Sequence, residues 1–475
     1  MKRNTQKPTE DRGQKTDDRR PTTDKNRKVT RRNFLRGTAA AAAFTIVPRY
    51  VLGGAGQTPP NEKLNIAGIG VGSMGASDLE NVRSENIVAL CDVDEEYAAH
   101  TFRTYPRAKI YKDYREMLDK QKDIDACVIA TPDHTHACIA MAAIKAGKHV
   151  YVEKPLTYSI YEARMLAKAA RQAKVETQMG NQGHASEDIR LIKEWIDDGA
   201  IGRVTEVQAW TTHAVWPQGM ERPRETPPVP PGLDWDLWLG PAPYRTYHPM
   251  YLPQIWRGWW DFGTGALGDM GCHVIDTAYY ALEMGQPTSV EASCSIFVPV
   301  VTWDKPFNNE SYPQASIVRY EFATHGKNPA PKLTWYDGGL MPQRPEELEE
   351  GRVMGNKLGG ILFIGEKGKI MAGPHGGNSP RIIPETKMKK YKLPPKSIPR
   401  SPGHHKEWLD ACKGGEAAKS NFNYAGPLTE LVLLGNIALR FRHQKLYWDS
   451  PNMKVTNIPE ANNYVHREYR SPWTL

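Results

Sequence analysis

Asp269, His273 and Asp276 are three ionisable residues separated by four and then three positions. On a helix these spacings bring all three side chains to one face, and an Asp-His-Asp stripe is unusual for a face that packs into a core. A histidine titrates near neutral pH and can accept the proton of an alcohol. Asp269 can orient the ring, stabilise its charged form or contact a substrate. We therefore interpret Asp269 and His273 as catalytic, and Asp276 as a substrate contact or an ion-pair partner.

Lys154 is the third catalytic candidate, because it lies in Glu153-Lys154-Pro155, at the end of the predicted strand 149–152. An ammonium group can donate a hydrogen bond to an oxygen that gains carbonyl character when an alcohol is oxidised. Each of these residues taken alone could be an ordinary helix cap or a buried structural side chain. The combination of Lys154, Asp269 and His273 favours catalysis.

A glycine-rich segment, Gly70-Val71-Gly72-Ser73-Met74-Gly75, lies between a predicted strand and a predicted helix. This spacing permits a tight turn and close backbone approach to a pyrophosphate, and the helix N-terminus offers free N–H groups to phosphates. Asp92 lies 22 residues after Gly70, where a carboxylate can bond both ribose hydroxyls. Because Asp92 would repel a 2′-phosphate, the sequence predicts NAD rather than NADP. The alternative is an ordinary glycine-rich turn.

The segments around these residues alternate between predicted strands and helices, which is typical of a parallel α/β sheet. Ligands of such sheets bind at the carboxyl ends of the strands. The predicted cofactor contacts lie at these ends: Gly70, Gly72, Ser73, Met74, Gly75, Asp92, Thr131, Pro132, His134, His136, Glu153 and Lys154. After the strand 176–179 we expect substrate contacts from Asn181, Gln182 and His184.

The stretch from Trp210 to Trp260 contains seven of the thirteen tryptophans of the chain, and eight prolines lie between positions 217 and 243. So many large rings exclude a flexible linker. Indole faces suit the C–H faces of sugars, and indole N–H groups can bond hydroxyls; packing between domains or subunits is the alternative. Arg257 and Trp260 are closest to the Asp269 motif, so we predict that they contact the substrate.

Residues 1–55 carry a net charge of +9 in a chain whose total is +8, which leaves −1 for residues 56–475. We therefore expect no nucleic-acid partner. Arg31 and Arg32, followed by Phe34 and Leu35, precede an apolar run at 37–47 that is too short to span a bilayer. This pattern resembles a twin-arginine signal. We expect export through the twin-arginine machinery to the periplasm or cell envelope, cleavage after Ala55 as a weaker prediction, and no stable membrane span.

Several histidines raise the alternative of a zinc site, namely His134, His136, His184, His273, His404 and His405. None of them has an H-E-x-x-H or cysteine-rich spacing, so we predict no metal. The six cysteines contain no C-x-x-C pair. We expect buried thiols, with one disulfide left open.

The motifs at 70–75, 130–136, 153–155 and 268–276 follow one another as in the Gfo/Idh/MocA (glucose-fructose oxidoreductase / inositol dehydrogenase) family, which the chain resembles over most of residues 62–450. The resemblance implies an α/β N-terminal Rossmann domain, which we place at 62–180. It also implies an α+β C-terminal domain with a large, mostly antiparallel sheet, which we place at 181–455 before a tail at 456–475. It further implies an NAD(P)-dependent oxidoreductase acting on a hydroxyl of a carbohydrate or polyol, with Lys154, Asp269 and His273 at the catalytic positions.

Two departures from the plainest family members leave the substrate open: the tryptophan-rich stretch near 206–262, and Gly180–His184, where some members carry an arginine. The leading hypothesis is an NAD-dependent oxidoreductase with tightly bound cofactor, assembled as a homo-oligomer. The second is a redox-neutral glycosidase or lyase that works through a keto-sugar, which the export signal motivates because free NAD is scarce outside the cytoplasm. The third is a non-catalytic binding protein, against which the intact catalytic set argues.

Overall fold

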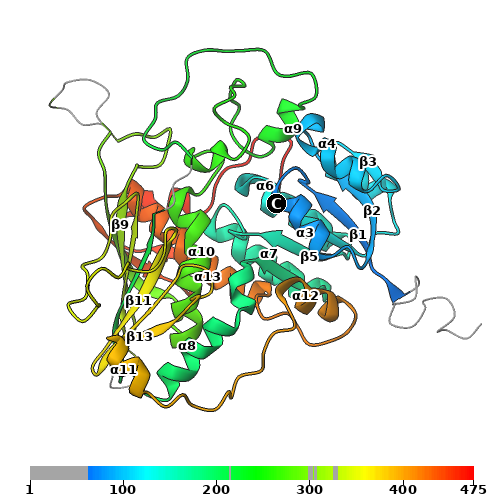
Figure 1. Ribbon diagram of the computed structural model, residues 1–475. Coiled ribbons are helices and arrows are strands. Elements are labelled where there is room, and N and C mark those ends of the chain that lie inside the picture. The colour runs from blue at the N-terminus through cyan, green and yellow to red at the C-terminus, as the bar shows by residue number, and fades with distance from the viewer. Residues whose placement is uncertain (1–61, 213–215, 298–302, 304–306, 325–329) are drawn as a thin grey trace, which may run out of the picture. The chain divides into compact units, whose positions relative to one another are not determined.

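The computed structural model describes residues 62–475, apart from 213–215, 298–302, 304–306 and 325–329. The predicted twin-arginine segment and its cleavage site lie outside the described residues. In the described chain, helices pack against two β-sheets (Figure 1). The strands of the first sheet lie between residues 65 and 180, and those of the second lie between residues 204 and 455.

The first sheet is entirely parallel and has the strand order β3-β2-β1-β4-β5-β6. Helices alternate with its strands along the chain, as the sequence predicts for a Rossmann fold. Its elements are β1 (Asn65–Ile69), α3 (Met74–Asn81), β2 (Asn86–Cys91), α4 (Glu95–Thr104), β3 (Lys109–Tyr111), α5 (Tyr114–Lys120), β4 (Ala126–Ile129), α6 (Asp133–Lys145), β5 (His149–Glu153), α7 (Ile160–Ala173) and β6 (Thr177–Gly180).

The central strands of this sheet are apolar because helices cover both faces. All four residues of β4 are buried, as are residues 66–69 of β1. Helix α7 begins with a reciprocal capping box, in which Ser159 and Glu162 each satisfy an amide of the other's backbone. Glu162 is itself fully buried, and it also receives contacts from the C-terminal tail.

The second sheet has the order β13-β12-β11-β7-β10-β9-β8-β14-β15, and all its neighbours are antiparallel except β7 and β10. The predicted large, mostly antiparallel sheet is therefore confirmed. Its strands are β7 (Val204–Thr211), β8 (Pro287–Cys294), β9 (Ser316–Phe322), β10 (Lys332–Asp337), β11 (Gly359–Gly365), β12 (Gly368–Ala372), β13 (Arg381–Ile383), β14 (Lys445–Asp449) and β15 (Lys454–Val455).

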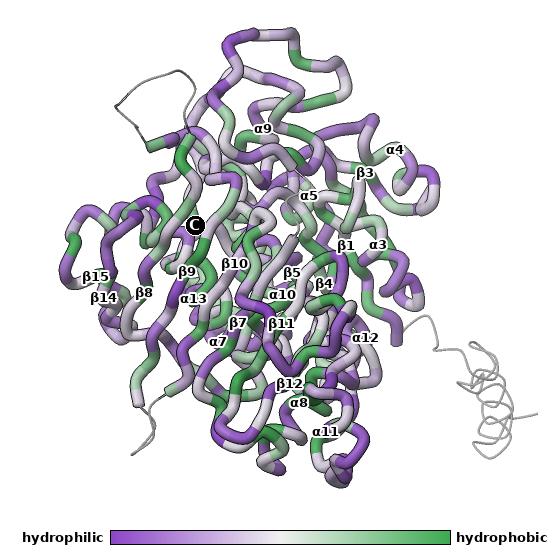
Figure 2. Tube along the Cα trace, turned by 60° about the vertical axis from the view of Figure 1, so that its left-hand side comes forward, coloured by the Kyte–Doolittle hydropathy of each residue, from purple (hydrophilic) through white to green (hydrophobic). Residues whose placement is uncertain are grey.

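Two long helices, α10 (Gly265–Leu282) and α13 (Phe422–Arg440), pack against one another and against this sheet. The other helical elements that follow the Rossmann sheet are shorter. They are η2 (Gln182–Ala185), α8 (Glu187–Asp197), α9 (Trp235–Leu239), η3 (Ile255–Gly258), α11 (Glu385–Lys390), α12 (His404–Cys412) and η4 (Pro459–Tyr464). Figure 2 shows α11 as mainly hydrophilic, in agreement with its lack of buried residues, whereas α13 is largely buried.

Strands β11 and β12 form a hairpin around Glu366, in which they pair from Ile361 with Ala372 to Gly365 with Gly368. Helix α13 continues through Pro427, and strand β8 ends at Cys294. No helix in the described residues is long and apolar enough to cross a bilayer, and all six cysteines are unpaired thiols.

The tail at 456–475 packs on its own chain. Tyr161 at the start of α7 donates a backbone hydrogen bond to the carbonyl of Val465. Trp473 packs against Tyr114 at the start of α5, with ring centroids 6.2 Å apart. The tail therefore lies over the Rossmann domain, a position that the polar, aromatic sequence alone does not indicate.

Candidate active site

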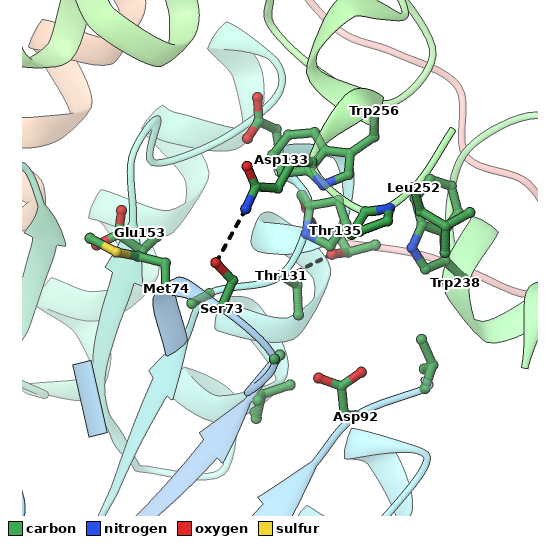
Figure 3. A pocket seen from close by; sticks show the side chains of 18 of the residues that line it. Ser73, Met74, Asp92, Thr131, Asp133, Thr135, Glu153, Trp238, Leu252 and Trp256 are labelled. Atoms are coloured by element: carbon green, nitrogen blue, oxygen red, sulfur yellow. Dashed lines mark hydrogen bonds between the residues drawn. The ribbon is translucent and has the colours of Figure 1, made fainter. Parts of the chain in front are cut away.

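A cavity of about 510 Å³ lies at the carboxyl ends of the parallel strands. It extends from Lys154, after β5, past the glycine-rich turn after β1, to Asp92 after β2 and Tyr114 after β3. Residues of η3 and α10 line it from the second half of the chain. Figure 3 shows that Asp92 and Glu153 are far apart within this pocket. The cavity is thus elongated across the sheet, as a dinucleotide requires.

The glycine-rich turn fits a pyrophosphate, because glycines hold it in a shape that other residues resist. Gly70 has φ +76, a left-handed conformation that glycine adopts without strain. A Cβ at Gly75 would lie 2.0 Å from the carbonyl oxygen of Gly70, and one at Gly72 would lie 2.1 Å from the ring of Tyr97. Gly70, Gly72, Ser73 and Met74 line the cavity. Gly75 does not, and instead lets α3 pack closely on the turn.

Asp92 joins the glycine-rich turn to the next loop. Its Oδ2 accepts a hydrogen bond from the Val71 amide at 2.8 Å, and its Oδ1 accepts one from the Asp94 amide at 3.0 Å. Burial raises the pKa of Asp92 to about 6, against the opposing effect of these two amides. Each carboxylate oxygen has a second lone pair, so Asp92 can still accept hydrogen bonds from two ribose hydroxyls.

Lys154 and Asp269 meet inside the cavity. The Lys154 Nζ lies 2.5 Å from Asp269 Oδ1, and the Arg257 Nε lies 3.0 Å from the same oxygen. Burial alone would raise the pKa of Asp269, but the charges of Lys154 and Arg257 outweigh it and hold this pKa well below its usual range. Asp269 is therefore ionised at neutral pH. The Arg257 guanidinium lies over the ring of Trp256, 4.2 Å from its centroid.

His273 lines the same cavity one helical turn after Asp269. Burial, reinforced by the charge of Lys154, lowers the pKa of His273 well below its usual value, so its ring is neutral at pH 7. Its Nδ1 is buried and has no hydrogen-bond partner among the described residues. The ring centroid of His375, from the loop after β12, lies 4.9 Å from that of His273. A neutral imidazole with an unsatisfied nitrogen can serve as a base.

Two further carboxyl groups line this part of the cavity. Burial raises the pKa of Glu153 to about 8, and Gln182 Nε2 donates to its Oε1 at 2.7 Å. Burial also raises the pKa of Asp133 to about 7, and Asp133 Oδ2 accepts a 2.5 Å hydrogen bond from Thr264. Both groups titrate close to neutral pH. Glu153, Gln182, Thr131 and Pro132 are predicted contacts that the structure does place on the cavity.

The structure does not bring His134 and His136 to the cavity. His134 Nδ1 lies 3.1 Å from the carbonyl oxygen of Phe262, and its Nε2 lies 3.0 Å from that of Trp238. The nitrogens of His136 lie 2.9 Å and 2.8 Å from the carbonyl oxygens of Pro155 and Thr131. Both imidazole rings therefore contact backbone carbonyl groups of neighbouring segments and do not face the cavity. The sequence places both residues at a strand end, but α6 begins at Asp133 and turns both side chains inward.

Only some of the predicted substrate contacts lie at the cavity. Arg257 and Gln182 line the cavity, whereas Asn181, His184, Trp260 and Asp276 do not. His184 Nδ1 and the Tyr424 hydroxyl lie 3.0 Å and 2.6 Å from the Asp276 carboxylate, which fits the alternative role of Asp276 as a partner of another buried side chain. Asn181 accepts a hydrogen bond from Ser420. Trp260 packs on Tyr312, with ring centroids 3.6 Å apart.

Sequence reasoning missed several residues that line the cavity. They are Asp133, Thr135, Trp216, Trp238, Gln254, Trp256, His375 and Trp473. Gln254 Nε2 lies 3.4 Å from the Ser73 hydroxyl, a contact drawn in Figure 3. The tryptophan-rich composition signals that Trp216, Trp238 and Trp256 belong to an ordered segment, but it cannot separate them from the core residues Trp210 and Trp259. No sequence signal points to His375 or Trp473, because each comes from a loop or tail distant in the sequence.

The described chain has a parallel Rossmann sheet with a glycine-rich turn, and a second, mixed sheet follows it. A helix packed on the second sheet reaches the same cavity. These features define a two-domain, dinucleotide-binding class of enzyme. Residues 64–181 match the NAD-binding Rossmann fold of the Gfo/Idh/MocA oxidoreductase family, and residues 186–303 match the C-terminal alpha/beta domain of that family. The chain is therefore similar to this oxidoreductase family over residues 64–181 and 186–303.

Among curated relatives, the levoglucosan dehydrogenase of Pseudarthrobacter phenanthrenivorans is 29% identical over 215 residues, which cover 44% of this chain and 45% of that protein. The inositol 2-dehydrogenase of Salmonella typhimurium is 32% identical over 141 residues, or 28% of this chain and 42% of that protein. The chain thus matches less than half the length of these relatives.

Solved structures support the fold. The WlbA dehydrogenase of Bordetella pertussis, in complex with NADH and UDP-GlcNAcA, has a TM-score of 0.56 at 18% identity, covering 82% of this chain and 99% of that one. A levoglucosan dehydrogenase in complex with NADH and levoglucosan has a TM-score of 0.53 at 20% identity, covering 81% and 99%.

Proposed function

We propose that the protein is an NAD-dependent oxidoreductase that acts on a hydroxyl group of a carbohydrate or polyol. The observation that carries the proposal is the meeting of Lys154, Asp269 and His273 in one cavity with a glycine-rich turn and Asp92. The names of the relatives, which specify levoglucosan and inositol, support this substrate class.

The residues of the cavity fit this chemistry. The turn from Gly70 to Gly75 would hold the pyrophosphate, and Asp92 would hold the ribose hydroxyls. When bound there, NAD would supply the hydride acceptor for the carbon that carries the substrate hydroxyl. The neutral ring of His273 accepts the proton of that hydroxyl at its unpartnered Nδ1, and later releases it to solvent. The substrate leaves as a carbonyl compound.

Lys154 stabilises the reacting oxygen in this scheme. Its Nζ carries three N–H donors, and one of them is used on Asp269. A second can donate to the substrate oxygen as that oxygen becomes a carbonyl. Asp269 positions Lys154, and its negative charge also favours the imidazolium that His273 forms during the step. Arg257 holds Asp269 from the side of Trp256.

The cofactor preference rests on Asp92. This carboxylate lies where a 2′-phosphate would have to fit, and its amide contacts with Val71 and Asp94 fix its position. No lysine or arginine among the described residues forms an ion pair with Asp92. A second negative charge at that point would be repelled. We therefore propose NAD over NADP.

The twin-arginine pattern motivates a second candidate, the redox-neutral glycosidase or lyase. Twin-arginine cargo folds before export, so NAD would be loaded in the cytoplasm and kept outside it. A cofactor that cannot be exchanged must be regenerated in place, either by a second substrate or by returning the hydride to the same sugar. We therefore propose tight cofactor binding together with either of these redox-neutral cycles.

The decisive experiment incubates protein from the exported fraction with glycosides, polyols and 3-keto sugars, and reads products and reduced nicotinamide together. A carbonyl product formed with an equivalent of reduced cofactor supports the oxidoreductase. Cleavage of a glycoside without net reduction supports the redox-neutral candidate. NAD-loaded protein that changes none of these compounds would contradict both. His100→Ala, on the exposed side of α4, is the matched control for His273→Ala.

A further inference from the structure

The end of the cavity remote from Lys154 is enclosed by residues that do not belong to the Rossmann fold. The sheet order places β3 and β2 on one side of β1, and β4 and β5 on the other. With the pyrophosphate at the turn after β1 and the reacting groups after β5, the adenine of a dinucleotide falls beyond Asp92, towards β3. The cavity there is lined by Tyr114, Leu237, Trp238 and Trp473.

Trp473 lines the cavity at this end. It is 7% exposed, and its Nε1 is buried with no hydrogen-bond partner among the described residues. The Arg115 guanidinium lies 4.5 Å from the ring centroid of Trp473, and Tyr114 packs at a 37° angle to the ring. An indole N–H usually finds a partner when it is buried. A purine base offers ring nitrogens as acceptors and a flat surface for an aromatic side chain.

Trp238 forms the other side of the enclosure. Its ring stacks on that of Trp235 at a centroid distance of 4.8 Å, and its backbone carbonyl is held by His134. Figure 3 shows Trp238 with Leu252 on the side of the pocket where Thr135 lies. His134 therefore fixes the wall of the cavity, although it does not reach the cavity itself.

The tail that carries Trp473 is fastened at two places. Arg467 Nε and the Tyr469 hydroxyl each donate to the buried Glu162 carboxylate at 2.8 Å. Arg470 contacts the α9 segment through Asp236, at 2.5 Å, and through the carbonyl of Gly240, at 3.0 Å. The backbone of Arg470 also donates to the carbonyl of Pro241. These contacts join the tail to the Trp238 wall.

We propose that Trp473 is a cofactor-binding residue, which the C-terminal tail brings to the adenine end of the cavity so that the tail and the α9 segment together enclose the dinucleotide. This inference rests on the proposed function, since it assumes that the cavity binds NAD. The indole stacks on the adenine or donates its Nε1 hydrogen to it. Release of NAD then requires the tail to separate from α9, so the tail lowers the dissociation rate.

The test measures the dissociation of NADH from the full chain. The NADH complex is mixed with excess NAD in a stopped-flow instrument, and the fluorescence of NADH is followed. Stacking of a base on an aromatic side chain is strong enough that Trp473→Ala should accelerate release about tenfold or more. Trp473→Phe, which keeps an aromatic ring but loses the indole N–H, should accelerate it less. Trp303→Ala is the matched control, because Trp303 is 99% exposed. NAD should also raise the melting temperature of the unaltered protein more than that of Trp473→Ala.

The outcomes separate the inference from the proposed function. If the unaltered protein binds no NADH, the proposed function fails and this inference fails with it. If it binds NADH but Trp473→Ala releases it at the unaltered rate, only this inference is overturned. If Trp473→Ala does not fold, Arg470→Ala provides the same test, because it removes the side-chain contacts of the tail with Asp236 and Gly240 without touching the cavity. An unchanged rate in Arg470→Ala then overturns the inference.

Discussion

Lys154 and Asp269 lie 115 residues apart in the sequence, and their side chains form a buried ion pair with an Nζ–Oδ1 distance of 2.5 Å. Lys154 follows the last residue of β5 in the Rossmann sheet, and Asp269 lies in the first turns of α10. The pair therefore forms only where the two halves of the described chain pack together. Removing Asp269 would leave the Lys154 charge buried without this partner, which is strongly destabilising, whereas removing Lys154 would leave Asp269 still paired with Arg257.

The first prediction concerns His273 as the base and Lys154 as the group that stabilises the substrate oxygen. His273→Ala and Lys154→Ala should each reduce turnover by about 10²–10⁴, the usual effect of losing a positioned acid or base. Bound NAD should remain, because the glycine-rich turn and Asp92 are untouched. Steady-state kinetics and the NAD content of each variant check this.

Two exposed residues of the same types serve as controls, namely His100→Ala on α4 and Lys168→Ala on α7. Both should retain full activity. Lys154→Ala also breaks the pair with Asp269, so its melting curve must be compared with that of the unaltered protein. Turnover close to normal in both active-site variants would remove the catalytic assignment.

The second prediction concerns cofactor choice. Asp92→Asn keeps the shape of the side chain and one acceptor for the ribose but removes the negative charge. We expect NAD to bind about tenfold more weakly and the preference for NAD over NADP to shrink, because the repulsion of a 2′-phosphate is gone. Equilibrium titration of both cofactors measures the two affinities. Tighter binding of NADP than of NAD by the unaltered protein would refute the argument.

The sequence predicts most of the Rossmann half, because its physical signals are local. The segment before Gly70 is continuously apolar, the glycines have a fixed spacing, and Asp92 ends the next strand. Strand β3 is missed because it is only three residues long and lacks buried positions. Helix α6 starts earlier than its apolar pattern suggests, because Pro132 has the extended conformation of an N-cap and Asp133 occupies the first turn.

The site is predictable where a motif carries it and not where tertiary packing does. Lys154, Asp269, His273 and Arg257 reach the cavity from segments with recognisable patterns. His375 and Trp473 reach it from segments that follow β12 and η4, and nothing in their local sequence distinguishes them from surface residues. Trp260 shows the reverse case, since its neighbour Arg257 turns into the cavity while Trp260 turns into the core.

The third prediction concerns pH and stability through Asp78 on α3. Asp78 is fully buried, its Oδ1 lies 3.0 Å from His405 Nε2, and its Oδ2 has no partner among the described residues. Burial raises its pKa from 3.8 to about 8. At pH values between 3.8 and about 8, the folded protein keeps a proton on Asp78 that the unfolded chain releases. The free energy of unfolding therefore falls as the pH rises, by at most about 1.4 kcal/mol per pH unit.

Asp78→Asn should remove this pH dependence, since an amide does not ionise. Relative to the unaltered protein, the variant should therefore be increasingly stabilised from pH 5 to pH 8, as measured by denaturant unfolding at each pH. Burial also raises the pKa of Glu153, so part of the decline in stability with rising pH will remain. Asp119→Asn, on the exposed surface of α5, is the control. Parallel stability curves for Asp78→Asn and the unaltered protein would show that Asp78 is ionised in the fold.

The fourth prediction concerns retention of the cofactor after export. Arg31 and Arg32 precede a short apolar run and a dinucleotide-binding domain. If the protein folds before export, NAD is loaded in the cytoplasm, and its loss outside would be nearly irreversible. Retention requires a slow dissociation rate, which is where affinities of related sites mostly differ. The enclosed cavity, with Gln254 over Ser73 at 3.4 Å, is consistent with slow release.

Protein purified from the exported fraction should therefore contain about one NAD(H) per chain after extensive dialysis, and added NAD should raise its rate little. The bound nucleotide is measured after denaturation of the protein. Arg31→Lys together with Arg32→Lys is the matched control, because it should hold the same protein in the cytoplasm with its cofactor still bound. Exported protein that lacks NAD, and whose activity rises strongly when NAD is added, would instead favour a dehydrogenase that exchanges its cofactor freely.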